Sequence, residues 1–364
     1  MLVRKKSYDL WQLVDRRNYK DLGNSDKKIR IVSDIDKTYL ETAFESWVKM
    51  ARIAFEDASD KKAVRGAPQL LSSLRWGDPD KAMTQKERSS YPRPLHFVSS
   101  SPPQLRNVLE EKLSMDGLDW SSDTFKNQAY NIRKRQFHLL KQQVAYKSAA
   151  LIQLISGEDP DATWYLIGDN AESDPFIYLG IKLLCEGKLS REAYGKWLSL
   201  ASVEPEVSQS LWGQDQAIPK GKIGGIFIRN IPNHRFFGES PLTDPITLFD
   251  SYLDASLVFY QCGLLTASAL EKIILLFHNL YDISPEEICS KLTSTIKHCG
   301  AKAQVAPLNE ILATFAKAAN ISLPASYTHA IKMAGLDFWN QLSEQDILQH
   351  GENWMNKIHL NKKH

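Results

Sequence analysis

Four aspartates follow two short stretches of the sequence at spacings that suit phosphoryl-transfer chemistry. Asp34 and Asp36 come directly after a β-branched stretch, and Asp169 and Asp174 follow an almost wholly apolar one. A carboxylate can attack phosphorus and form an aspartyl-phosphate, which divides one difficult hydrolysis into two easier displacements. These positions make Asp34 the candidate nucleophile of a phosphoryl-transfer site.

Polar residues at neighbouring positions have the types that such a reaction requires. Asp36 can protonate the leaving oxygen and later take a proton from the attacking water. The hydroxyl of Ser99 can donate a hydrogen bond to a phosphoryl oxygen, and Lys147 can neutralise charge on the nucleophile and the phosphoryl group. Thr38 and Ser100 stand close to these residues in the sequence, and we predict that they bind the substrate.

A metal ion is the expected cofactor. A nucleophilic anion that approaches a phosphate dianion needs positive charge, and Mg²⁺ held by a few carboxylates and waters supplies it. Asp34 and Asp169 are the natural ligands, and Asp36 and Asp174 complete the predicted set.

Each signal alone also has an ordinary structural explanation. An Asp-x-Asp pair after a strand is more often a turn or a helix cap, and calcium-type loops use similar residues. Ser99 before Ser-Ser-Pro-Pro is typical of a strand end, and Lys147 alone is typical of a solvated helix. The chemical interpretation depends on four such signals in one order, each at the proper end of its element.

Apolar stretches that alternate with helical patterns position these residues. The stretches that predict strands are 28–33, 95–98, 163–167 and 224–229. Strands that are apolar throughout and alternate with helices indicate a parallel sheet covered on both faces. Ligands bind at the carboxyl ends of the strands in such a sheet, where the candidate residues lie. The predicted fold class is therefore α/β, with a Rossmann-like parallel sheet.

The same patterns divide the chain into three predicted parts. Residues 1–27 form an N-terminal helical extension, and residues 28–244 form the catalytic domain, with a helical insertion at about 187–219. Residues 245–364 show only helical patterns and form an all-α C-terminal region. Its expected helices are 248–259, 267–280, 285–297, 308–319 and 338–350. Residues 116–143 lack clear periodicity.

Composition excludes several classes of protein. With 364 residues, 43% of them hydrophobic and 24% charged, the chain is globular rather than disordered or fibrous. A net charge of +2 argues against a nucleic-acid partner. No apolar run is long enough to span a bilayer and no signal-peptide core follows the N-terminus, so we expect a cytoplasmic protein. The cysteines form no CxxC pair.

The order of these motifs resembles the four motifs of the haloacid dehalogenase superfamily. The matching stretches are 34–38, 98–99, Lys147 and 168–174. Members of this superfamily are mostly Mg²⁺-dependent phosphatases with an aspartate nucleophile, so the resemblance implies both a Rossmann-like fold of this type and that activity.

A closer resemblance is to the catalytic domain of the actin-patch-associated phosphatidate phosphatase family, which has many bacterial relatives. It is carried by 97–102, 146–147 and 166–178, with further similarity at 65–68 and 225–230. This similarity covers about residues 28–235 and leaves the helical remainder outside.

The resemblance implies a role for each predicted site residue. These roles are nucleophile for Asp34, acid/base for Asp36, phosphate-binding hydroxyl for Ser99, charge-neutralising lysine for Lys147, metal ligand for Asp169, and ligand or its support for Asp174. One departure is Lys37, where the family usually carries an acid. A cation beside the mouth of the site is expected to alter the choice of substrate rather than abolish catalysis.

Three functions follow from these observations. The resemblance implies a phosphatidate phosphatase, which releases diacylglycerol and phosphate and must reach a membrane surface. Peripheral membrane contact would then involve the basic and apolar residues 4–14 and the basic cluster 133–135, although an N-terminal helix more often docks on its own domain. The alternatives are a phosphatase for soluble metabolites or phosphoproteins, and a non-enzymatic scaffold that acts through the C-terminal region.

Overall fold

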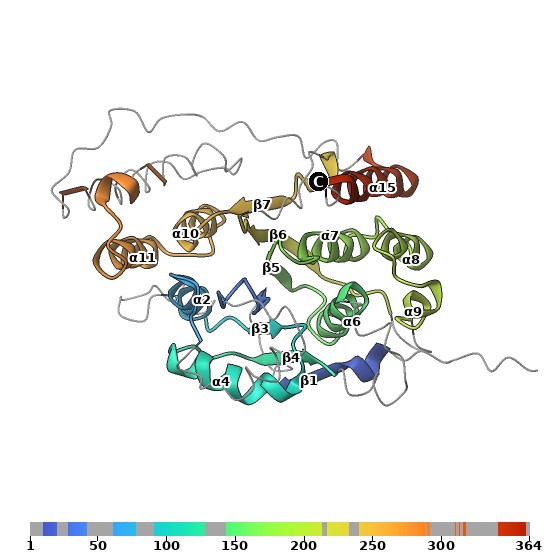
Figure 1. Cartoon of the computed structure of the whole chain (residues 1–364), viewed down its shortest axis with the longest axis horizontal. Helices are drawn as coiled ribbons and strands as arrows, with labels where there is room; N and C mark the ends of the chain where they lie inside the picture. Colours follow the sequence, from blue (N-terminus) through green and yellow to red (C-terminus); the bar gives the residue numbers. More distant parts are fainter. Residues whose placement is uncertain are drawn as a thin grey trace, which may run out of the picture.

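The chain folds around one central sheet (Figure 1). The computed structural model describes residues 10–19, 28–41, 61–77, 91–127, 143–212, 217–232, 240–288, 290–291 and 341–361, with single positions at 310, 313, 316 and 317. The sheet has seven strands in the order β1-β4-β3-β2-β5-β6-β7. The strands are β1 (Val14–Asn18), β2 (Ile29–Ser33), β3 (Leu95–Val98), β4 (Ser122–Lys126), β5 (Thr163–Asp169), β6 (Lys222–Arg229) and β7 (Ile246–Phe249).

Parallel pairing brings the carboxyl ends of most strands to the same edge of the sheet. Every neighbouring pair is parallel except β1 and β4, which are antiparallel. The predicted strands 28–33, 95–98, 163–167 and 224–229 are confirmed as β2, β3, β5 and β6. The predicted α/β class with a mostly parallel sheet is therefore confirmed as well.

Helices cover both faces of this sheet, which is why its central strands are largely apolar. On β2, Ile31 faces one core and Val32 the other, because successive side chains of a strand point to opposite faces. Figure 1 shows α2 (Ala67–Trp76), α10 (Tyr252–Gln261) and α11 (Ala267–Asn279) together on one side of the sheet. Four more helices complete the two layers: α4 (Arg106–Met115) on this side, and α6 (Gln143–Ser156), α7 (Asp174–Cys185) and α8 (Arg191–Leu200) on the other.

The described residues of the predicted helical insertion at 187–219 contain two helices. They are α8 and the short α9 (Pro205–Gln209). The hydroxyl of Ser190 caps α8 by accepting a hydrogen bond from the backbone N–H of Ala193 at 3.2 Å. Trp197 of α8 stacks on Phe176 of α7 at a centroid distance of 4.6 Å, which joins α8 to the neighbouring helix.

The predicted N-terminal helix is present in residues 10–19 only as the short 3₁₀ helix η1 (Leu10–Leu13). The prediction is wrong for Val14–Asn18, which form strand β1. Pairing with β4 satisfies the backbone groups along one side of β1, and the side chains of Leu10 and Leu13 are buried against the core that contains α6. Tertiary pairing therefore overrides the local helical pattern.

Strand β4 lies where the sequence showed no periodicity. All five of its residues are buried although four of them are polar. Their polar groups have partners: the carboxylate of Asp123 accepts a hydrogen bond from Arg106 Nε at 2.8 Å. Partners from other elements allow β4 to be buried with polar side chains. The strand therefore has no hydrophobic pattern that the sequence alone would reveal.

The sequence predicted that the region after residue 245 is wholly helical, and this prediction is wrong at its start. Its first element is β7, which adds a parallel strand to β6. Helix α10 then begins with a capping box between Ser251 and Asp254, which fixes its start at Tyr252. The predicted helix 267–280 is confirmed as α11, and most of 285–297 and 308–319 lies outside the described residues.

The last helix returns to the opposite face of the sheet. Helix α15 (Glu344–Asn361) packs against α8, and Trp354 lies with its ring centroid 6.1 Å from that of Phe176. Gly351 leaves room for Trp197, whose ring would lie 2.6 Å from a Cβ there. The C-terminal region thus packs on both faces of the catalytic sheet. Among the described residues, no helix is long and apolar enough to cross a membrane.

His96 on β3 gives a test of this packing. Its side chain is fully buried, Nδ1 lies 2.8 Å from the hydroxyl of Ser122, and burial together with the charges of Arg16, Arg30 and Arg75 lowers its pKa well below the ordinary 6.5. The imidazole then binds a proton in the unfolded chain but not in the folded one, so the free energy of unfolding decreases as pH falls below 6.5. Between pH 7.5 and 5.5 we expect wild type to lose about 1.4 kcal/mol in free energy of unfolding relative to His96→Gln.

Chemical denaturation of both proteins at the two pH values measures this difference. Carboxyl groups titrate in the same range in both proteins, so the change in the gap isolates His96. A gap that does not change with pH would contradict a buried neutral imidazole.

Candidate active site

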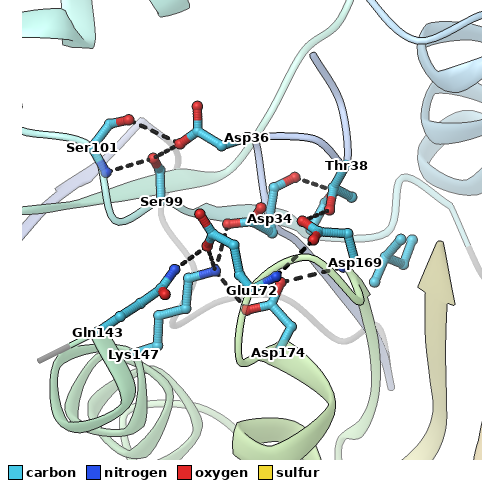
Figure 2. A network of polar contacts seen from close by, with 12 residues as sticks. Asp34, Asp36, Thr38, Ser99, Ser101, Gln143, Lys147, Asp169, Glu172 and Asp174 are labelled. Atoms are coloured by element: carbon cyan, nitrogen blue, oxygen red, sulfur yellow. Dashed lines mark hydrogen bonds and ion pairs between the residues drawn. The ribbon is translucent and has the colours of Figure 1, made fainter. Parts of the chain in front are cut away.

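The predicted site residues lie together at the carboxyl ends of β2, β3 and β5 (Figure 2). Asp34 follows β2, Ser99 follows β3 and Asp169 ends β5. The backbone N–H of Asp34 donates to the carbonyl of Ile167 at 2.9 Å, which joins the first and third of these junctions.

A buried lysine joins the acidic residues. Lys147, in the second turn of α6, places its Nζ 2.8 Å from Asp34 Oδ1, 2.6 Å from Asp174 Oδ1 and 3.2 Å from Glu172 Oε2. Burial opposes the charge on Lys147, but the charges of Asp174, Asp34 and Glu172 outweigh it and raise its pKa. Lys147 therefore stays an ammonium. Burial raises the pKa of Asp34, and the charge of Lys147 opposes that rise.

Asp36 lies in a separate, hydroxyl-lined part of the site. Its Oδ2 accepts hydrogen bonds from Ser99 Oγ at 3.1 Å and Ser101 Oγ at 2.9 Å. Burial, and then the charge of Glu172, raise the pKa of Asp36 to about 7, while the two hydroxyls oppose the rise. A carboxyl group with a pKa near neutrality is suited to give and take protons.

Asp169 is held by the loop that follows β5. Its Oδ1 accepts hydrogen bonds from the backbone N–H groups of Ala171 at 2.7 Å and Glu172 at 3.1 Å, and its Oδ2 accepts one from Thr38 Oγ1 at 3.2 Å. Gly168 is required for this arrangement, because a Cβ there would lie 2.5 Å from Asp174 Oδ2.

The turn after Asp34 has an unusual backbone. Lys37 has φ of 60°, in the left-handed region, which costs an L-residue with a Cβ about 1 kcal/mol. The turn closes with hydrogen bonds from the N–H groups of Tyr39 and Leu40 to the carbonyl of Ile35, at 2.8 and 2.9 Å. It places Asp36 and Thr38 on either side of Lys37.

The donor set fits a divalent cation. Asp34, Glu172 and Asp174 each offer a carboxylate oxygen, and the three oxygens lie within 4.8 Å of one another. Carboxylate oxygens are the donors that Mg²⁺ prefers. Of the predicted ligands, Asp34 and Asp174 belong to this group of three, whereas Asp36 and Asp169 lie outside it.

Several residues of the site were missed from the sequence. Glu172 contacts Lys147 and accepts a hydrogen bond from Gln143 Nε2, and it lies between the predicted ligands Asp169 and Asp174. That position in an acid-rich loop was the available signal.

The two residues predicted to bind substrate have different surroundings. Thr38 holds Asp169, as described above. The hydroxyls that donate to Asp36 belong to Ser99 and Ser101, the first and third residues of a run of three serines. Ser100, the predicted substrate-binding residue, is the middle one of this run. The geometry of the turn decides which hydroxyls face Asp36. Residue type alone could not predict this, because all three residues are serines.

Fold and site together define a class of protein. A mostly parallel α/β sheet with a lysine-held aspartate and a second, hydroxyl-bound aspartate at its carboxyl edge is equipped for hydrolysis of phosphate esters. Residues 29–188 match the family model described as phosphatidate phosphatase APP1, catalytic domain.

This match confirms the resemblance to the actin-patch-associated phosphatidate phosphatase family and the prediction of a phosphatase. It includes all the predicted site residues but ends before β6, and so it is shorter than the predicted 28–235. Comparison with curated proteins and with solved structures found no match.

The buried ion cluster makes a prediction about stability. Lys147→Met leaves Asp34, Asp174 and Glu172 without their cation, and the loss of one partner from a buried charged group costs about 3 kcal/mol in free energy of unfolding. Denaturation in the presence of a chelator measures the loss. Added Mg²⁺ should reduce it, because a divalent cation replaces part of the missing charge.

Lys196→Met is the matched control. Lys196 pairs with Glu192 at 2.8 Å, but both side chains are largely exposed, so the free energy of unfolding should not change. Equal stability of the Lys147 and Lys196 variants would show that the carboxylates do not depend on Lys147.

Proposed function

We propose that the protein is a Mg²⁺-dependent phosphatidate phosphatase that acts through an aspartyl-phosphate on Asp34, the chemistry of the haloacid dehalogenase superfamily. The observation that carries the proposal is the geometry of Asp34. Lys147 holds its Oδ1 at 2.8 Å, while its Oδ2 has no hydrogen-bond partner among the described residues. One oxygen is fixed and the other is left to attack.

Charge neutralisation is the first requirement of this attack. Mg²⁺ held by Asp34, Glu172 and Asp174, with Asp169 close by, would offset the negative charge of the phosphoryl group. Lys147 keeps the nucleophile oriented. Lys126 is a second buried basic residue near the site: its Nζ lies 5.9 Å from the ring centroid of Tyr146, whose hydroxyl donates to the carbonyl of Ser99, and burial lowers the pKa of Lys126 to about 8.

The first displacement forms the bond between Asp34 Oδ2 and phosphorus and breaks the ester bond. Asp36, protonated, gives its proton to the departing oxygen, which leaves as the diacylglycerol hydroxyl. A pKa of about 7 leaves a substantial fraction of Asp36 protonated at neutral pH. Ser99, which donates to Asp36 in the free site, can turn its hydroxyl to a phosphoryl oxygen.

The second displacement frees the enzyme. Asp36, now ionised, takes a proton from water as that water attacks phosphorus, and the bond to Asp34 breaks to release phosphate. One carboxyl group therefore serves both steps, and the hydroxyls of Ser99 and Ser101 keep it in place between them.

The family match favours a lipid substrate, and the N-terminal segment bears on how the protein would reach it. Within residues 10–14, the side chains of Leu10 and Leu13 are buried in the domain's own core. This supports docking of the segment on the domain over membrane contact through these two residues. Residues 4–9 of the first stretch predicted for membrane contact, and the basic cluster 133–135, lie outside the described residues. A cytoplasmic enzyme that binds membranes peripherally is our proposal for its location.

The nucleophile assignment is tested by paired variants. Asp34→Asn should reduce Mg²⁺-dependent hydrolysis of an aryl phosphate by at least a thousandfold, because the amide is not a nucleophile toward phosphorus. Asp36→Asn should still form a phosphoenzyme with the same substrate but turn it over slowly. Trapping of labelled phosphate by acid quench distinguishes the two variants. Turnover retained in Asp34→Asn would contradict the proposed nucleophile.

The substrate class is tested by a direct comparison. Purified protein with Mg²⁺ is assayed against vesicles that contain phosphatidate and against a set of soluble phosphomonoesters and phosphopeptides. We expect the highest kcat/KM for phosphatidate. A preference for soluble esters would keep the chemistry and replace the substrate, whereas folded protein inactive on every ester would favour the scaffold function.

A further inference from the structure

Two side chains from beyond the matched segment hold the turn that carries Asp36 and Thr38. Arg229 Nη1 donates to the carbonyl of Lys37 at 2.5 Å, and the hydroxyl of Tyr252 donates to the carbonyl of Thr38 at 2.8 Å. Arg229 ends β6 and Tyr252 begins α10, so both follow residue 188, where the family match ends.

This turn needs to be held. Lys37 adopts a left-handed backbone that residues with a side chain rarely adopt, and such conformations persist when the surrounding structure determines them. Both neighbours of Lys37 belong to the site: Asp36 accepts from Ser99 and Ser101, and Thr38 donates to Asp169. A turn that relaxed would displace both at once.

Tyr252 is well placed for this task. Its side chain is fully buried, and the capping box of Ser251 and Asp254 fixes the first turn of α10, to which it belongs. The ring of Phe249 lies against it at a centroid distance of 5.3 Å. The hydroxyl therefore has little freedom to point elsewhere.

The same part of the chain also holds the other acidic loop. The side-chain amide of Asn170, next to Asp169, donates from Nδ2 to Asn230 Oδ1 at 2.8 Å and accepts at Oδ1 from the N–H of Ile231 at 2.6 Å. Asn230 donates in turn to Asp250 Oδ1 at 2.8 Å. Both loops that bear the site's carboxylates thus depend on the ends of β6 and β7.

We propose that Tyr252 and Arg229 are positioning residues of the reaction, which hold the Lys37 turn so that Asp36 and Thr38 keep their places. The part of the chain after residue 188 then helps to order the active site through these two residues. This inference rests on the proposed phosphatase function and adds to it the residues that maintain the site.

Tyr252→Phe is the first test, because it removes only the hydroxyl. We expect kcat for hydrolysis of a phosphomonoester to fall about tenfold or more with KM within twofold of wild type. Tyr281→Phe is the control: Tyr281 also follows the matched segment, and its hydroxyl accepts from the N–H of Gly66 at 3.1 Å, at the start of α2. It should keep the wild-type kcat. Equal losses in the two variants would reduce the role of the region to general stabilisation and overturn the proposal.

A second variant tests the mechanism of positioning. If Tyr252 acts by holding the left-handed turn, Lys37→Gly should partly rescue Tyr252→Phe, because glycine adopts this conformation without a steric penalty. We expect the double variant to regain at least threefold in kcat over Tyr252→Phe. Absence of rescue would overturn the proposed role of the turn.

Metal binding gives a readout that does not depend on turnover. Thermal unfolding is measured at increasing Mg²⁺ concentration for wild type, Tyr252→Phe and Tyr281→Phe. The Mg²⁺ concentration that gives half of the maximal rise in Tm is the midpoint for each protein. We expect the midpoint to rise at least threefold in Tyr252→Phe alone, because Thr38 holds Asp169, and Asp169 in turn accepts a hydrogen bond from the N–H of Glu172, a member of the metal-binding group. An unchanged midpoint together with an unchanged kcat would overturn the inference. Wild-type protein that binds Mg²⁺ but hydrolyses no phosphomonoester would instead contradict the proposed function.

Discussion

The ion cluster around Lys147 is the interaction on which the site depends. A buried ammonium is tolerable only when carboxylates surround it, and buried carboxylates are tolerable only with a cation among them. Lys147 lies on α6, Asp34 follows β2 and Asp174 begins α7, so the cluster requires three elements to meet at one point. The packing of α6 and α7 in one hydrophobic core brings these groups together. Fold and chemistry are therefore coupled at this lysine.

In the proposed mechanism, two different tasks fall to two carboxyl groups of the site. Asp34 lies beside the ammonium of Lys147, whose charge favours the ionised carboxylate, and Asp36 lies among hydroxyls, where burial brings its pKa to about 7. The two residues are only two positions apart in the chain. The left-handed backbone at Lys37 turns the chain directly after them and sends Thr38 back to Asp169. In the proposed mechanism, a difference in surroundings rather than in residue type distinguishes the nucleophile from the acid/base.

The C-terminal region is bound to the catalytic sheet more closely than its helical sequence suggested. Strand β7 and helices α10 and α11 belong to the half of the molecule that contains α2, while α15 packs on α8 across the sheet. Arg93 on the catalytic side donates from Nη1 to the carbonyl of Leu264 at 2.6 Å. The hydrophobic periodicity of these helices predicted their existence but not the surfaces that they cover, because a helical stripe does not specify its partner.

Much of the fold and most of the site could be predicted from local sequence. Apolar stretches defined β2, β3, β5 and β6, and the residues at their ends identified Asp34, Asp36, Ser99 and Asp169, because parallel strands bring their carboxyl ends to one edge.

The features that only the tertiary structure decided all depend on contacts between segments that are distant in the sequence. Strand β1 depends on an edge offered by β4, and β4 buries polar residues whose partners lie elsewhere. Tyr252 reaches the carbonyl of Thr38 across 214 positions of sequence. Local patterns record which side chains a segment must bury. They do not record which distant backbone group a single hydroxyl will find, since that contact exists only after the cores have packed.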